Sequence, residues 1–107
     1  MQPWASCTSK DGKRIALTEK RWSHVAESHN YMAGLQHFVL ETVANPDYVV
    51  RGGEKEKLAV KFYPATPIGA KHLVVVYLEN QEGFIVTAFM TSQLDKILRR
   101  GVLWQKP

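Results

Sequence analysis

Two histidines share one predicted helix with a basic side chain. His24 and His29 follow Arg21 in the segment 19–29. Because the imidazole pKa lies near neutral pH, histidine is the side chain that most readily gives and accepts protons there. The two residues are five positions apart, so at about 100° per residue they point about 140° apart and are poor joint ligands for one metal ion. The pattern indicates acid–base chemistry, and the competing interpretation is two ordinary half-buried histidines.

The predicted strands carry residues that can hold an anion. Lys61 shares one strand face with Tyr63, and Arg51 precedes a Gly-Gly turn. Thr87 and Thr91 flank the end of the last long strand and can donate hydrogen bonds. Each also has an ordinary structural interpretation, because solvated strand lysines, solvated loop arginines and strand threonines are common. Taken alone, these residues do not decide between a site and a surface.

Two amphipathic helices are expected to position the histidines. Thr18 is a suitable N-cap for a helix over residues 19–29. Four residues recur there at helical spacing and form an apolar face: Trp22, Val25, Ala26 and His29. A second helix is predicted over residues 32–44, and it ends at Asn45 because the residue before a proline is pushed out of the helical region.

The hydrophobic period then changes from helical spacing to two. This predicts a short strand over 14–18, strands over 47–51, 58–63, 72–78 and 84–90, and a short closing helix near 94–98. The 72–78 and 84–90 strands are apolar on both faces, so their hairpin is placed in the middle of the sheet. The order β-α-α-β-β-β-β-α predicts an α+β domain, with helices packed on one face of an antiparallel sheet.

The composition is that of one folded domain. The chain has 107 residues, of which 45% are hydrophobic and 22% charged, and a net charge of +4. We divide it into a flexible leader, residues 1–12, and a single domain, residues 13–107. One cysteine excludes an intramolecular disulfide, and no apolar run approaches the roughly 18 residues that a membrane span needs. Without a signal-peptide pattern, we expect a cytoplasmic protein with no membrane partner.

Basic residues gather at two places in the sequence. They are Lys10, Lys13, Arg14, Lys20 and Arg21 near the start, and Lys96, Arg99, Arg100 and Lys106 near the end. Each group is either a solvated face or a track for a phosphate backbone. Aromatic residues are not interleaved with them at any repeating interval, so the charge pattern alone is a weak indication of nucleic-acid binding.

Three stretches occur in an order that resembles a known superfamily. They are RWSHVAESH (residues 21–29), ETVANPDYV (41–49), and KFY (61–63) followed by GFIVTAFMT (83–91). Together they resemble the barnase-EndoU-colicin-RelE (BECR) superfamily, in particular its small nuclease-like branch associated with phages and mobile elements. The resemblance runs from about Ile15 to Trp104, which is most of the chain.

The resemblance implies a metal-independent ribonuclease fold. Its N-terminal helices would pack on a four- or five-stranded antiparallel sheet, with RNA lying across the sheet. It also implies a toxin-like protein with no cofactor and with an acidic antitoxin or immunity protein as partner. Position by position, His24 and His29 match the helix histidines, Lys61 matches a basic strand position, and Thr87 and Thr91 match the last-strand positions.

RNA cleavage without a metal ion sets clear chemical requirements. A base removes the proton of the 2′-hydroxyl, an acid protonates the departing 5′-oxygen, and a cation or donor stabilises the phosphate. The expected catalytic residues are His24, His29, Lys61 and Thr87, and the expected substrate-binding residues are Arg21, Arg51, Tyr63 and Thr91. In this hypothesis a histidine is the acid–base group and Lys61 stabilises the phosphate.

Two alternatives to a ribonuclease remain open. The first is a non-catalytic RNA- or protein-binding module of the same fold. It is motivated by the modest charge and by Asn30 and Tyr31 after His29, where members of the superfamily usually have Pro and an acidic residue. The second is a protein-interaction subunit anchored by Trp4 or Trp104. Salt-dependent RNA binding without cleavage favours the first, and salt-insensitive protein binding favours the second.

Overall fold

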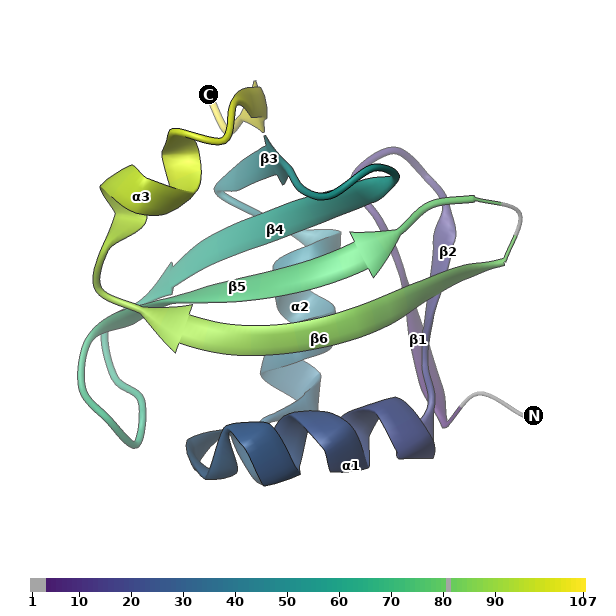
Figure 1. Ribbon diagram of the computed structural model, residues 1–107, viewed down its shortest axis with the longest axis vertical. Coiled ribbons are helices and arrows are strands. Elements are labelled where there is room, and N and C mark those ends of the chain that lie inside the picture. Colours follow the sequence, from purple (N-terminus) through teal and green to yellow (C-terminus); the bar gives the residue numbers. More distant parts are fainter. Residues whose placement is uncertain (1–3, 81) are drawn as a thin grey trace.

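The computed structural model describes residues 4–80 and 82–107, which form one seven-stranded sheet and three α-helices (Figure 1). The elements in chain order are β1 (Ala5–Thr8), β2 (Arg14–Leu17), α1 (Glu19–Ser28), a 3-10 helix (Asn30–Met32), α2 (Gln36–Ala44), β3 (Tyr48–Arg51), β4 (Glu56–Tyr63), β5 (Lys71–Leu78), β6 (Gly83–Thr91), α3 (Leu94–Leu98) and β7 (Val102–Gln105). The strand order is β1-β2-β6-β5-β4-β3-β7. The β5–β6 hairpin thus lies inside the sheet, which confirms the position predicted from its apolar strands.

The predicted sheet of four or five antiparallel strands is wrong in both number and direction. The sheet has seven strands, and β2 runs parallel to β6. The predicted order β-α-α-β-β-β-β-α lacks β1, which forms within the expected leader of residues 1–12, and β7, which forms in the tail. Residues 1–3 of that expected leader lie outside the described residues.

The two additional strands are short and have weak sequence patterns. Each has four residues. The small side chains of β1 alternate between half-buried and exposed, and β1 pairs with β2 alone. The pairing of β7 with β3 contains a β-bulge, which interrupts strict alternation. Both strands therefore depend on backbone pairing with a distant neighbour rather than on a local hydrophobic period.

Capping and helix-breaking residues determine where α1 and α2 begin and end. The Thr18 hydroxyl accepts the Arg21 backbone N–H at 3.1 Å, which confirms the N-cap of α1. The second helix, predicted from residue 32, begins only at Gln36. Gly34 has a φ of +81°, a left-handed conformation that interrupts a right-handed helix and suits glycine. The helix ends at Ala44, before Asn45 and Pro46, as predicted.

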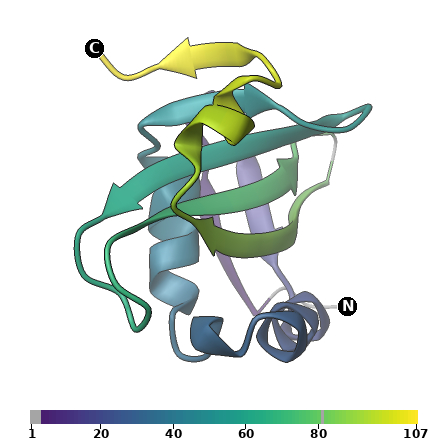
Figure 2. The ribbon, with the colours of Figure 1, turned by 60° about the vertical axis from the view of Figure 1, so that its left-hand side comes forward.

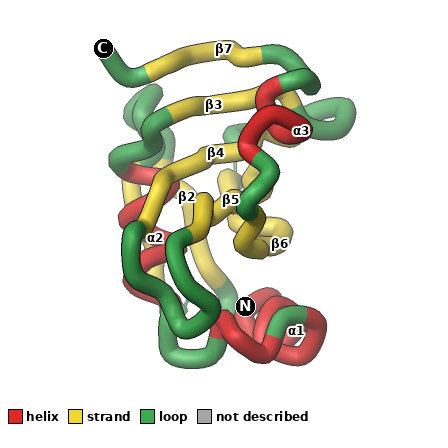
Figure 3. Tube along the Cα trace, turned by 90° about the vertical axis from the view of Figure 1, so that its left-hand side faces the viewer, coloured by secondary structure: helices red, strands yellow, loops and turns green. Residues whose placement is uncertain are grey.

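Hydrophobic side chains pack on both faces of the sheet. We call the face against α1 and α2 the inner face; its core strand residues are Ile15, Leu17, Ala59, Leu73, Val75, Tyr77, Ile85 and Ala88. We call the opposite face the outer face; its core strand residues are Val50, Leu58, Val60, Val74 and Val76, which pack with Ile97 of α3. Figures 2 and 3 show α2 and α3 on opposite sides of β4. Both faces of the central strands are therefore apolar, as their sequences require.

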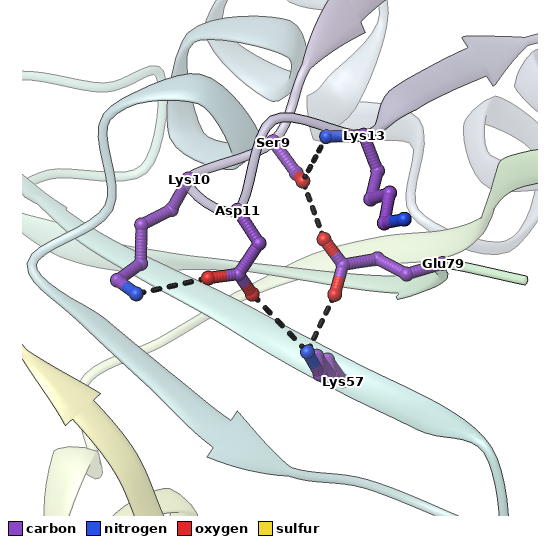
Figure 4. Close-up of polar contacts among 6 residues, drawn as sticks. All are labelled: Ser9, Lys10, Asp11, Lys13, Lys57 and Glu79. Atoms are coloured by element: carbon purple, nitrogen blue, oxygen red, sulfur yellow. Dashed lines mark hydrogen bonds and ion pairs between the residues drawn. The ribbon is translucent and has the colours of Figure 1, made fainter.

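A chain of polar contacts fastens the β1–β2 turn to the sheet (Figure 4). The Ser9 hydroxyl and the Lys57 ammonium both donate to the Glu79 carboxylate. Lys57 Nζ also lies 3.3 Å from Asp11 Oδ2, and Lys10 Nζ lies 3.0 Å from Asp11 Oδ1. Because Lys57 belongs to β4 and Glu79 directly follows β5, these contacts join the N-terminal hairpin to two interior strands.

The Asp11 carboxylate makes a small, pH-dependent contribution to stability. Its hydrogen bond with Lys10, followed by that with Lys57, holds its pKa below the ordinary value of 3.8. A carboxyl whose folded-state pKa is lowered adds stability above its unfolded pKa and loses it as the pH falls through the folded value. We expect Asp11→Asn to remove less than about 1 kcal/mol at neutral pH, because the side chain is 42% exposed and the ion pairs are screened.

Urea unfolding of the parent and of Asp11→Asn checks this expectation. The difference between the two midpoints should be present at neutral pH and shrink as the pH falls through the lowered pKa of Asp11, where the parent carboxyl also takes up a proton. A difference that persists unchanged in acid contradicts the assignment.

Candidate functional site

Part of the outer face of β5 and β6 lies beyond the cover of α3, whose Ile97 packs in the same core as Val74 and Val76. In Figure 1, α3 lies at the upper left and α1 lies below β6, and the face of β5 and β6 between them is open to the viewer. The strand register places Phe62 opposite His72 and His72 opposite Thr91. This row lies on the outer face because Val60 and Val74, two positions along the same strands, belong to the core beneath α3.

Aromatic rings dominate this row and the next one. Phe62 is 44% exposed, and its ring centroid lies 5.0 Å from that of His72. In the next row, the half-buried rings of Tyr48 and Phe89 flank two core valines. A large ring left open on a sheet face offers a flat apolar surface to another ring. The outer face therefore provides a stacking surface that is continuous with the hydrophobic core.

Basic side chains border this face on two sides. Cζ of Arg21, on α1, lies 5.3 Å from the ring centroid of Phe84, a cation–π geometry. On α3, Lys96 and Arg99 are exposed and line an open depression of about 360 Å³, together with Asp95. The first helix thus places a cation at the Phe84 end of β6, and α3 places cations after its Thr91 end, where the aromatic rows lie.

Lys61 and Tyr63 lie on the inner face, away from this surface. Lys61 pairs with Leu73, an inner-core residue, and its Nζ donates to the Asn45 carbonyl oxygen at 3.1 Å. The Tyr63 hydroxyl donates to Glu41 at 2.7 Å, and burial raises the pKa of this phenol. Both residues therefore join β4 to the end of α2.

Thr87 and Thr91 lie on the outer face. Thr87 pairs with Val76 of the outer core, beside a β-bulge, and Thr91 pairs with His72. Because Lys61 faces the other way, the structure does not bring Lys61 and Thr87 into one site. The expected phosphate-stabilising lysine and this expected donor are separated by the sheet itself.

The two histidines of α1 have different surroundings. His24 is exposed, whereas His29 is half-buried at the C-cap of the helix. His29 Nδ1 lies 3.3 Å from the Tyr31 hydroxyl, which also accepts the Met90 backbone N–H at 3.1 Å. The His29 ring centroid lies 6.2 Å from that of Phe89. Only His29, of the two, is positioned against the end of β6 and its outer-face aromatic residue.

Arg51 lies at the other end of β4 from Phe62. It pairs with Lys57 at the start of β4, and its backbone N–H donates to the Gly101 carbonyl oxygen at 2.9 Å. The exposed side chain lines an open depression of about 470 Å³ formed by the β3–β4 turn and Leu103. The structure therefore does not bring Arg51 together with the outer-face row.

Two residues of the outer-face row were missed by the sequence reasoning. Phe62 lies within the predicted strand 58–63 and His72 begins the predicted strand 72–78, but neither is among the expected site residues. Strict alternation places Phe62 on the same strand face as Val60. Because Phe62 lies near the end of the strand, the sequence could have indicated an exposed aromatic ring on that face. What the sequence did not contain was the register that places His72 beside it.

Neither a metal site nor a membrane-spanning helix is found in the described part of the chain. Residues 4–80 and 82–107 contain no cluster of three His, Cys, Asp or Glu that could hold a metal ion. None of the helices in these residues has the length and apolar character needed to cross a bilayer.

Comparison with known proteins assigns neither a family nor a function to this chain. The BECR resemblance rests on the three sequence stretches alone and stays a prediction. No family of known proteins, no curated protein and no solved structure matches the chain.

Proposed function

We propose that this protein binds single-stranded RNA on the outer face of its sheet. The observation that carries the proposal is the Phe62–His72 pair, which presents an exposed ring and a cross-strand neighbour on the uncovered part of the sheet. Single-stranded nucleic acids are recognised by stacking their unpaired bases on aromatic side chains of this kind. Each stacked base contributes about 1–3 kcal/mol to binding.

The charge distribution supports an anionic ligand for the same face. The chain carries a net charge of +4, and Lys96 and Arg99 lie on α3, which follows the Thr91 end of β6, while Arg21 lies over Phe84 at the other end of that strand. Cations that neutralise phosphates release bound counterions, so affinity falls steeply as salt rises. A base stacked on Phe62 with its phosphates directed toward α3 would use both the exposed ring and the basic side chains of that helix.

Phe62→Ala is the direct test of the stacking surface. We expect it to weaken binding of a labelled single-stranded RNA by about 10- to 100-fold, because one base loses its stacking partner. Fluorescence anisotropy at several salt concentrations measures both the affinity and its salt dependence. Trp4→Ala is the matched control, since Trp4 is 50% exposed but lies before β1, outside the outer-face rows.

The outcomes of this experiment are distinct. Loss of affinity in Phe62→Ala with an unchanged salt dependence supports stacking, because the phosphate contacts remain. Equal affinities of the parent and Phe62→Ala contradict the proposed surface. A folded parent that binds no RNA at low salt contradicts RNA binding altogether.

Metal-independent ribonuclease activity is the second candidate function. The observation that favours it is the position of His29 beside Phe89, with Nδ1 facing the Tyr31 hydroxyl. A hydrogen bond at Nδ1 fixes the ring and leaves Nε2 to exchange a proton with a ligand on the outer face. Thr87 and Thr91 supply hydroxyl groups on that face. Cleavage of RNA in EDTA by the parent protein is the result that this candidate requires.

A further inference from the structure

The β7 edge of the sheet exposes apolar side chains beside unpaired backbone. β7 ends the strand order and pairs with β3 on one side only. Figures 2 and 3 show no described element beyond it. Val102 is 44% exposed and Leu103 is 45% exposed. An edge strand of this kind presents both free N–H and C=O groups and a surface that gains stability from being covered.

The opposite edge of the sheet is built differently. β1 exposes Ser6 and Thr8, which are small and polar. Proteins protect edge strands from unwanted pairing with charged side chains, proline or bulges. β7 itself contains neither a charged residue nor a proline, and its bulge lies on the paired side. The contrast between the two edges indicates that the free side of β7 can pair with a further strand.

The charges at the two ends of β7 define the partner. Arg99 and Arg100 are exposed just before the strand, and the Lys106 side chain, which follows it, is 60% exposed. Lys106 Nζ lies 3.3 Å from Asp47, and Asp95 is the one acidic residue in the final segment from residue 93. A strand lying along β7 therefore meets the exposed Arg99 and Arg100 at one end and, at the other, the exposed ammonium of Lys106, which a single carboxylate pairs.

A second copy of this chain is a poor fit to that pattern. A twofold contact would pair β7 with its own copy in antiparallel orientation. Arg100 of one copy would then approach Lys106 of the other at both ends of the ladder. Like charges placed opposite each other across strands are destabilising. The charge pattern therefore favours a different strand with acidic ends.

We infer that β7 is a docking edge for an extended segment of a partner protein, with apolar residues in its centre and Asp or Glu at both ends. The segment adds one strand to the sheet through main-chain hydrogen bonds, and its side chains cover Val102 and Leu103. This edge is distinct from the outer-face rows of the proposed RNA surface.

A labelled synthetic peptide tests the inference on the intact protein. In the probe, Val and Thr alternate through the centre and Glu occupies both ends; the control peptide carries Lys at the ends instead. We expect the Glu-ended peptide to bind about tenfold more tightly than the Lys-ended control. In the control, several surface ion pairs with the basic residues beside β7 are replaced by like-charge contacts. N-methylation of every central peptide bond in the Glu-ended probe should abolish binding, because it removes all the main-chain donors that could face β7.

Leu103→Lys and Phe62→Ala separate this edge from the RNA surface. Leu103→Lys should reduce peptide binding about tenfold or more while RNA binding is retained, and Phe62→Ala should leave peptide binding unchanged. A Tm close to that of the parent confirms that Leu103→Lys is folded. Equal binding of the Glu- and Lys-ended peptides, undiminished binding of the N-methylated peptide, or no binding of any peptide overturns the inference. So does sedimentation of the parent as a dimer that Leu103→Lys dissociates.

Discussion

Gly83→Ala is expected to lower the free energy of unfolding by about 3 kcal/mol, which lowers Tm by about 15 °C for a domain of this size. Gly83 begins β6, where it pairs with Ile15 of the parallel strand β2. A Cβ at this position would lie 2.6 Å from the Arg14 carbonyl oxygen and 2.9 Å from the Leu78 carbonyl oxygen. Both atoms belong to the backbone of neighbouring strands, so neither can move without disturbing the sheet.

Gly53→Ala is the matched control for this prediction. A Cβ at Gly53 would meet the carboxylate oxygen Oε1 of Glu56 at 2.9 Å, but that atom ends a flexible side chain and can move aside. We expect its effect to stay within about 0.5 kcal/mol. Thermal melts followed by circular dichroism compare both variants with the parent. An unchanged Tm in Gly83→Ala would contradict the close parallel contact of β2 and β6, which is the feature that separates this sheet from the antiparallel one expected.

The sequence predicted the elements with strong periods and missed those without one. Trp22 and Val25 recur at helical spacing, and both are buried in α1 as predicted. β5 and β6 are apolar on both faces, and this property placed them correctly inside the sheet. β1 and β7 are held by backbone pairing to strands far away in the sequence, so local composition carries little information about them. The same is true of the parallel contact between β2 and β6.

The candidate site was harder to predict than the fold. Alternation shows which residues of one strand share a face, but it does not show whether that face is on the same side of the sheet as a given face of the next strand. Lys61 and Tyr63 share a face, as the sequence indicated, yet that face is the inner one. Alternation counted back from Thr91 through Thr87 would place Ile85 on the outer face. The β-bulge between these positions reverses the phase, and Ile85 is fully buried in the inner core. No residue pattern marks that bulge.

For the candidate ribonuclease activity, His29→Ala is expected to slow metal-independent RNA cleavage by about 10²- to 10⁴-fold, the usual contribution of one proton-transfer group. The reason is positional: His29 lies against Phe89 at the end of β6, and Tyr31 engages its Nδ1. End-labelled RNA incubated with protein in EDTA gives the rate, and 2′,3′-cyclic phosphate ends identify attack by the 2′-hydroxyl.

His24→Ala is the control that makes this result interpretable, since His24 lies on the same helix but is exposed. Its cleavage rate should stay within about twofold of the parent, because it has no contact with the outer face. A loss confined to kcat in His29→Ala, with RNA affinity retained, separates proton transfer from stacking by Phe62. Equal losses in the two histidine variants contradict the role given to His29. If the folded parent leaves RNA intact in EDTA, the ribonuclease candidate is contradicted, and the half-buried imidazole of His29 is explained by its contacts with Tyr31 and Phe89.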